Sequence, residues 1–123
     1  MAVDNWHDGR VPSRSFEVAI DANDPQRLRR FWKAALGYVE QTTPEGAVDL
    51  VDPAGRRPTI WFQQVPEPKT SKNRLHLDLR VTAAERAALT QQLTALGGAV
   101  IQEHPRFTVM ADPEGNELCL AEG

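Results

Sequence analysis

Two local signals recur in this chain at the same separation of 60 residues. Leu36-Gly37 returns as Leu96-Gly97, and Asp52-Pro53-x-Gly55 returns as Asp112-Pro113-x-Gly115. The first pair is typical of a helix end and the second of a tight turn. Either signal alone can recur by chance. Their common offset and order favour a duplicated unit, so the chain is predicted to fold as two similar halves.

The first half predicts a strand, a helix and three further strands. Phe16, Val18 and Ile20 alternate with mixed residues over 15–21, which is typical of a half-buried strand. Asp24-Pro25 is a helix start, and Gly37 ends that helix. Its apolar stripe comprises Leu28, Phe31, Trp32 and Ala35. The predicted strands that follow cover residues 38–42, 47–51 and 59–65.

The second half repeats this order. A strand is predicted over 75–81, and Thr82-Ala83-Ala84-Glu85 is a capping box that starts a helix ending at Gly97-Gly98. The expected buried face of this helix comprises Ala88, Leu89, Gln92, Leu93 and Leu96. The last predicted strands cover residues 99–103, 107–111 and 117–121.

A chain of 123 residues fits one compact domain. We predict a flexible N-terminal extension over residues 1–14 and a domain over residues 15–123. Unit one spans about 15–66 and unit two about 74–121, with an exposed connection rich in proline and basic residues between them.

Charge and composition exclude several functions. The 14 Lys and Arg residues against 17 Asp and Glu give a net charge of -3, and no basic block is present to neutralise nucleic-acid phosphates. No apolar run is long enough to cross a bilayer. Cys119 is the only cysteine and the first residues lack the pattern of a signal peptide, so we expect a reducing, cytoplasmic location.

Several motifs, in order and with the right spacing, resemble those of the vicinal oxygen chelate superfamily, specifically its small glyoxalase-like domains related to glyoxalase and bleomycin-resistance proteins. The resemblance covers residues 15–121. Its carriers are Val18-Ala19-Ile20-Asp21-Ala22-Asn23-Asp24-Pro25, Leu28, Phe31-Trp32-Lys33-Ala34-Ala35-Leu36-Gly37-Tyr38, Asn73-Arg74-Leu75-His76-Leu77-Asp78-Leu79 and Asp112-Pro113-Glu114-Gly115-Asn116-Glu117-Leu118-Cys119-Leu120.

The resemblance implies an α+β fold in which two βαβββ units form an open, cup-shaped mixed sheet, with helices outside and a ligand cavity in the cup. It also implies a homodimer, because the cup of such proteins is often completed across a subunit contact. A short chain with much exposed sheet edge also favours a homodimer.

Metal-dependent members of this superfamily use four inward-facing ligands. By motif matching, these positions fall on Glu17, His76 and Cys119, with the fourth near Trp61. An indole N–H has no lone pair to give a metal ion, so the set is incomplete and no obligatory metal is expected. A three-ligand zinc or iron site formed by Glu17, His76 and Cys119, with Gln63 nearby, stays open as the alternative.

His76 and Glu17 are the candidate catalytic residues, as a general acid/base and as a base next to a carbonyl. The structural alternatives are a histidine that only hydrogen-bonds its neighbours and a glutamate paired with an arginine. Residues expected to contact a ligand are Trp61, Gln63, Asp78, Phe107 and Cys119. For the aromatic residues and the cysteine, ordinary core packing is the alternative.

Three functions follow from these residues. The first is a protein that binds a small organic molecule and acts as a metal-independent lyase or isomerase, with His76 and Glu17 moving a proton. The second is a non-catalytic drug- or metabolite-binding protein of the bleomycin-resistance type. The third is a metal-dependent glyoxalase or dioxygenase, which requires a retained metal ion. One fold hosts all three, so the fold alone does not choose between them.

Overall fold

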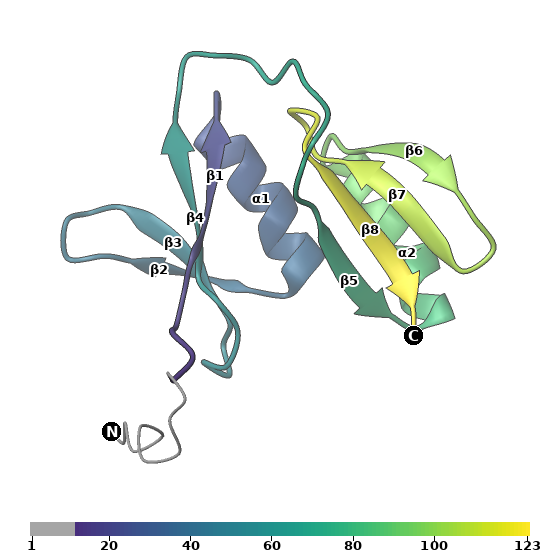
Figure 1. Ribbon diagram of the computed structural model, residues 1–123, viewed down its shortest axis with the longest axis horizontal. Coiled ribbons are helices and arrows are strands. Elements are labelled where there is room, and N and C mark those ends of the chain that lie inside the picture. The colour runs from purple at the N-terminus through teal and green to yellow at the C-terminus, as the bar shows by residue number, and fades with distance from the viewer. Residues whose placement is uncertain (1–11) are drawn as a thin grey trace.

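The computed structural model describes residues 12–123, so most of the extension predicted at residues 1–14 lies outside the described residues. The predicted α+β class and the two βαβββ units are confirmed (Figure 1). The elements are β1 (Val18–Ala22), α1 (Pro25–Leu36), β2 (Val39–Thr42), β3 (Val48–Val51), β4 (Ile60–Gln64), β5 (Leu77–Val81), α2 (Ala83–Ala95), β6 (Ala99–Glu103), β7 (Phe107–Ala111) and β8 (Glu117–Glu122).

Each unit forms its own four-stranded sheet. Sheet A, from the first unit, has the order β1-β4-β3-β2, and sheet B, from the second, has the order β5-β8-β7-β6. In both sheets the first strand pairs in parallel with the last, while the other pairs are antiparallel, so both sheets are mixed. Strands β1 and β5 are edge strands, each hydrogen-bonded on one side only among the described residues.

The predicted start and end of α1 are confirmed. The Asp24 side chain accepts a hydrogen bond from the backbone N–H of Arg27, and Pro25 occupies the first helical position. Gly37 ends the helix with a φ of 68°, a left-handed conformation that glycine adopts without a Cβ penalty. These signals act over a few residues, which is why sequence alone locates them.

The two Asp-Pro-x-Gly turns adopt the same structure in both units. The backbone N–H of Gly55 bonds to the Asp52 carbonyl at 2.8 Å, and that of Gly115 bonds to the Asp112 carbonyl at 2.9 Å. Each aspartate side chain also accepts backbone N–H groups of its own turn. This repeated geometry supports the duplication predicted from the 60-residue offset.

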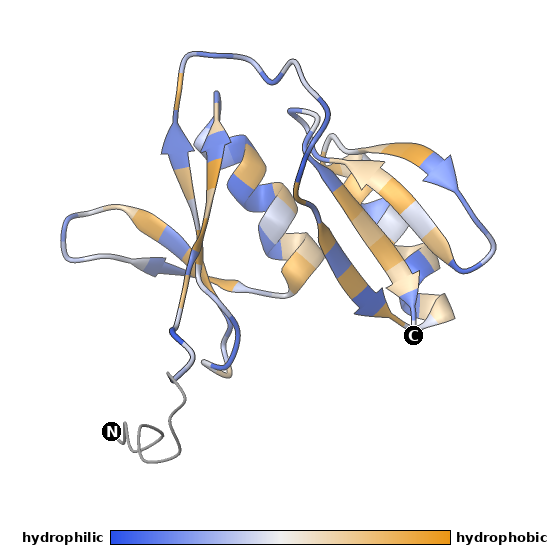
Figure 2. Cartoon of the chain, viewed as in Figure 1, coloured by the Kyte–Doolittle hydropathy of each residue, from blue (hydrophilic) through white to orange (hydrophobic). Residues whose placement is uncertain are grey.

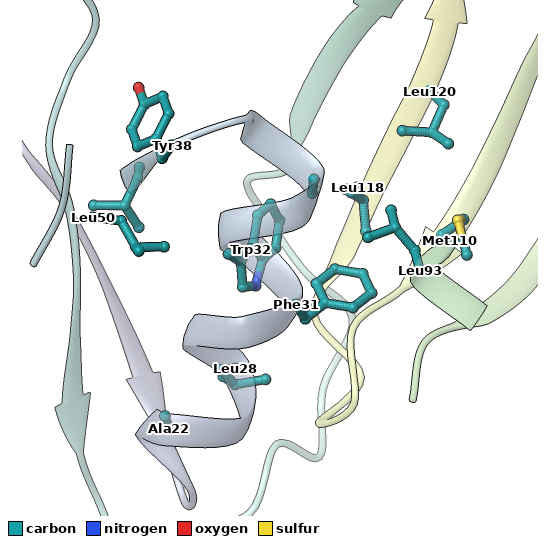
Figure 3. Close-up of a cluster of buried hydrophobic side chains, with 12 residues drawn as sticks. Ala22, Leu28, Phe31, Trp32, Tyr38, Leu50, Leu93, Met110, Leu118 and Leu120 are labelled. Atoms are coloured by element: carbon teal, nitrogen blue, oxygen red, sulfur yellow. The ribbon is translucent and has the colours of Figure 1, made fainter. Parts of the chain in front are cut away.

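Helix α1 packs between the two sheets. Figure 3 shows Phe31 and Trp32 on α1, with Leu118 and Met110 of the second unit on one side and Leu50 of the first unit on the other. All five side chains are buried. Apolar and polar residues alternate along the strands in Figure 2, so each sheet turns one face to this core and the opposite face away from it.

The first strand of each unit begins later than predicted. Strand β5 begins at Leu77, not Leu75, and Leu75 is 87% exposed. Before this start, the side-chain Oδ1 of Asn73 accepts the backbone N–H of Glu117, the first residue of the neighbouring strand β8. Strand β1 likewise begins at Val18, three residues later than predicted.

The buried face of α2 is narrower than predicted. Leu93 is fully buried and Leu89 and Leu96 are partly buried, but Ala88 and Gln92 are exposed because they border an open groove beside the last turn of α1. The predicted capping box is confirmed. Within residues 12–123, neither helix is long and apolar enough to cross a membrane.

Candidate functional site

The face of sheet B that points away from the core carries the polar side chains of the candidate site. Leu77 and Leu79 of β5 pack against the core, so the alternation of a strand directs Asp78 to the opposite face. Asp78 is the register partner of Cys119 on β8, and Cys119 is in turn opposite Val109 on β7. Residues paired in this way share one face of the sheet.

His76 lies one residue before β5 and hydrogen-bonds to Asp78. Its Nδ1 is 2.9 Å from Oδ1 of Asp78. A carboxylate only accepts hydrogen bonds, so Nδ1 donates the proton and the lone pair of the neutral imidazole is at Nε2. The side chains of His76 and Asp78 are 44% and 62% exposed, so this contact is not core packing. The arrangement can present a base to a molecule on this face.

Cys119 completes a compact cluster with these two residues. One donor atom from each of His76, Asp78 and Cys119 lies within 4.8 Å of the other two. Burial raises the pKa of the Cys119 thiol, and the negative charge of Asp78 together with their hydrogen bond raises it further. Cys119 is therefore a neutral thiol at neutral pH, not an activated nucleophile.

Lys72 and Glu117 form an ion pair at the edge of the same face. The hydrogen bond from Lys72 lowers the pKa of the Glu117 carboxyl, so Glu117 is ionised at neutral pH. Glu117 is not among the site residues predicted from the sequence. Its position two residues before Cys119 on a strand was the signal that could have found it, since residues i and i+2 share a face.

Two predicted site residues, Trp61 and Gln63, lie on the other sheet. Their register partners on β1 are Ala19 and Asp21, which are exposed, so all four belong to the face of sheet A directed away from the core. Glu17 is exposed just before β1 and its carboxylate is not part of the cluster around His76. The structure does not bring the two predicted catalytic residues, Glu17 and His76, into that one cluster.

Phe107 lies on β7, opposite Ala121 of β8. Its ring stacks on the imidazole of His104, with 4.1 Å between ring centroids and 18° between the planes. One side of the Phe107 ring is therefore already covered by a residue of this chain.

A cleft of about 700 Å³ separates the edges of β1 and β5. Residues from both faces of β1 line it, together with the connection between the units and the start of β5. The larger apolar side chains in its lining include Val18, Ile20, Trp32, Val65, Leu75 and Leu77. Both unpaired strand edges thus border one partly apolar cleft.

The four-ligand metal set implied by the resemblance is not assembled within one chain of this structure. Trp61 offers no lone pair, and Glu17 precedes β1 of sheet A, whereas His76 precedes β5 and Cys119 lies on β8 of sheet B. What the structure brings together instead is Asp78 and Cys119 on two neighbouring strands of sheet B and His76 directly before the first of them.

Comparisons with known proteins agree with this architecture. The family model of the glyoxalase-like domain matches residues 17–121. No match to a curated protein was found.

Three similar solved structures represent the fold. The fosfomycin resistance protein FosX from Mesorhizobium loti is 12% identical, with a TM-score of 0.74 over 92% of this chain and 94% of that one. A variant FosX from Listeria monocytogenes, complexed with Mn(II) and 1S,2S-dihydroxypropylphosphonic acid, is 14% identical, with a TM-score of 0.70 over 90% of both chains. A glyoxalase/bleomycin resistance protein/dioxygenase family enzyme from Burkholderia phytofirmans PsJN is 21% identical, with a TM-score of 0.66 over 86% and 95%.

At these identities the similar structures establish the fold alone, whereas the family match spans nearly the whole described chain. The chain therefore belongs to the glyoxalase-like domain family of the vicinal oxygen chelate superfamily.

Proposed function

We propose that this protein binds a small organic molecule on the outward face of sheet B and moves a proton on it, as a lyase or isomerase that does not depend on a metal ion. The observation that carries the proposal is the 2.9 Å contact between Nδ1 of His76 and Oδ1 of Asp78. An imidazole held by a carboxylate keeps one tautomer and one orientation, which is what a general base requires.

In this mechanism Nε2 of His76 removes a proton from a carbon next to a carbonyl group. Asp78 holds the ring through Nδ1 and stabilises the imidazolium that forms. Cys119 lies beside Asp78 as a neutral thiol and contributes contact surface. The Lys72–Glu117 pair borders the site.

The second catalytic candidate, Glu17, requires a second copy of the chain. We propose a homodimer in which β1 of one subunit pairs with β5 of the other, because both strands have an unpaired edge that borders the same cleft. A two-fold axis pairs the free edge of β1 and the free edge of β5 in both subunits, and only β2 and β6 then remain edge strands among the described residues. Exposed Phe16 and Leu75, at 67% and 87%, flank these edges. Glu17 of the partner subunit would then share a cup with His76.

The dimer can be tested with a substitution that blocks one edge. The backbone N–H of Val18 points toward β4, where it bonds to the Thr59 carbonyl, so the alternating N–H of Ala19 points to the free edge. Ala19→Pro removes that donor and should give a monomer by light scattering, whereas Ala19→Val should remain a dimer. A wild-type monomer at micromolar concentration would contradict the dimer.

Proton abstraction can be tested without knowledge of the natural substrate. A panel of small ketones and α-hydroxyketones is incubated with the protein in D₂O, and loss of the α-proton signal is followed by NMR. His76→Gln should slow the exchange at least about 100-fold. His104→Gln, a histidine stacked on Phe107, is the matched control.

If the His76→Gln variant still exchanges the α-proton at the wild-type rate, His76 is not the base. Panel members that bind with no exchange in the wild type would favour the non-catalytic binding protein. A wild type that loses its exchange on dialysis against a chelator would favour the metal-dependent alternative.

A further inference from the structure

The open groove beside the last turn of α1 is a second cavity, with a volume of about 730 Å³. The first unit contributes the end of α1 and the turn after β3, and the second contributes β5 and α2. No residue that lines this groove also lines the cleft between β1 and β5. Among the residues assigned to the proposed reaction, Asp78 alone borders it. The groove is therefore a separate candidate for ligand binding.

Part of the groove wall is apolar. It includes Leu36 at the end of α1, Leu79 and Val81 of β5 and Leu89 of α2, all of which are half-buried. A cavity of this size accommodates a small organic molecule, and these side chains offer contact to an apolar body.

Three acidic side chains also line the groove, and each already accepts hydrogen bonds within the chain. Asp52 accepts backbone N–H groups of its own turn at 3.0 Å. Oδ1 of Asp78 contacts Nδ1 of His76, and Oε1 of Glu85 accepts the backbone N–H of Thr82 at 2.8 Å. These carboxylates therefore have partners without a ligand.

Two arginines line the groove as well, Arg57 from the turn after β3 and Arg80 from β5. Within residues 12–123, neither guanidinium forms an ion pair or donates a hydrogen bond to another side chain. Both arginines are exposed, so a ligand can reach them from solvent. A guanidinium keeps its charge and offers several N–H donors in one plane. The charged donors left without a partner in this groove are thus cationic, and an anion would pair with them.

The chemistry of the groove selects the anion. A carboxylate is planar and accepts two parallel N–H bonds from one guanidinium. The three acidic side chains repel a second negative charge, so a dicarboxylate or a phosphate dianion would bind less well than a monocarboxylate. The apolar wall favours a carboxylate that carries a hydrocarbon body.

We infer that this groove binds a small monocarboxylate with an apolar body. Its carboxylate pairs with Arg57 and Arg80, and its hydrocarbon part covers Leu79 and Leu89. The inference does not rest on the proposed function, because it needs neither a reaction nor a second subunit.

Hexanoate is the probe, and ¹H–¹⁵N correlation NMR of the full-length protein maps where it binds. We expect one hexanoate per chain, with shifts concentrated at backbone amides of the last turn of α1, of β5 and of α2. Matched compounds each change one feature: hexanamide lacks the charge, acetate lacks the hydrocarbon body, and adipate carries a second carboxylate. Each should bind at least about tenfold more weakly than hexanoate.

The variants test the two arginines directly. Arg57→Gln and Arg80→Gln should each weaken hexanoate binding at least about tenfold and leave hexanamide binding unchanged. Arg30→Gln is the matched control, because Arg30 is an exposed arginine of α1 that does not line the groove. It should bind hexanoate as the wild type does. Circular dichroism on each variant verifies that it is folded.

Shifts concentrated in the cleft between β1 and β5, or hexanoate binding that neither Arg57→Gln nor Arg80→Gln weakens, would overturn the inference. No binding to the folded wild type at millimolar hexanoate would overturn it as well. In the proposed homodimer the partner's strand lies along β5. Hexanoate that binds only to Ala19→Pro would therefore show that the partner's strand fills the groove, and would also overturn the inference.

Discussion

The indole Nε1 of Trp32 donates a buried hydrogen bond of 2.9 Å to Oδ2 of Asp112, a residue 80 positions further along the chain. Trp32 belongs to α1 in the first unit, and Asp112 begins the turn between β7 and β8 in the second. Both residues are at most 3% exposed. This one contact ties the core helix of one unit to the repeated turn of the other.

Removal of this bond should weaken the whole fold. Trp32→Phe keeps much of the buried ring but loses the donor to a charged acceptor, which should lower the free energy of unfolding by about 1.5–3 kcal/mol. Urea denaturation monitored by circular dichroism measures it. Trp61→Phe, on the outward face of sheet A, should cost less than about 1 kcal/mol. Equal losses at the two positions would contradict a special role for the Trp32–Asp112 bond.

A second link between the units caps the start of α1. Both carboxylate oxygens of Glu114 accept backbone N–H groups, from Asn23 and from Asp24, each at 2.7 Å. Glu114→Ala should therefore lower stability by about 1 kcal/mol, as expected for loss of a helix cap. Glu114→Gln retains one acceptor and should lose less. Thermal unfolding of both variants gives the order, and a Gln variant less stable than the Ala variant would refute the capping role.

Stability should depend on pH through Asp52. Backbone hydrogen bonds from Ala54, and then from Arg56 and Arg57, lower the pKa of the Asp52 carboxyl in the folded chain. A lowered folded-state pKa stabilises the protein above the unfolded-state pKa, and this stabilisation is lost as the pH falls through the folded-state value.

Asp52→Asn should accordingly be less stable than the wild type at pH 7, and the difference should shrink as the pH falls below the ordinary pKa of an aspartate, about 3.9. Urea midpoints at several pH values measure this trend. A difference that stays constant over the whole range would show that the charge of Asp52 contributes nothing.

Cys119 should react slowly with iodoacetamide at neutral pH. Burial and the neighbouring Asp78 carboxylate raise the pKa of the thiol, so less thiolate is present than in a free cysteine. Asp78→Asn removes the charge and should speed the reaction, and so should unfolding in urea. Mass spectrometry follows the alkylation against glutathione as a reference. A folded wild type that reacts faster than glutathione would contradict the raised pKa.

Local signals made parts of this fold predictable from sequence. Asp24, Pro25 and Gly37 define α1 because capping and left-handed termination depend on a few adjacent residues. The start of β5 was not predictable from alternation alone, because a strand begins where its pairing with a distant strand begins, and β8 lies about 40 residues further along the chain.

His76, Asp78 and Cys119 were predictable as individual candidates, but their grouping was not. Alternation correctly assigned Asp78 to the same face as His76. The parallel register that places Asp78 beside Cys119 depends on how β5 and β8 pair, which no local pattern encodes. The separation of Glu17 from His76 likewise depends on the packing of α1 against both sheets.

The most direct test of the account is the tautomer of His76, measured by long-range ¹H–¹⁵N correlation NMR at a pH where the ring is neutral. His76→Gln identifies the signals, and Asp78→Asn removes the carboxylate that holds Nδ1. If Asp78 orients His76 as a base, Nδ1 carries the proton and Nε2 the lone pair in the wild type, and Asp78→Asn loses this preference. A proton on Nε2 in the wild type, or a tautomer unchanged by Asp78→Asn, would contradict His76 as a base oriented by Asp78.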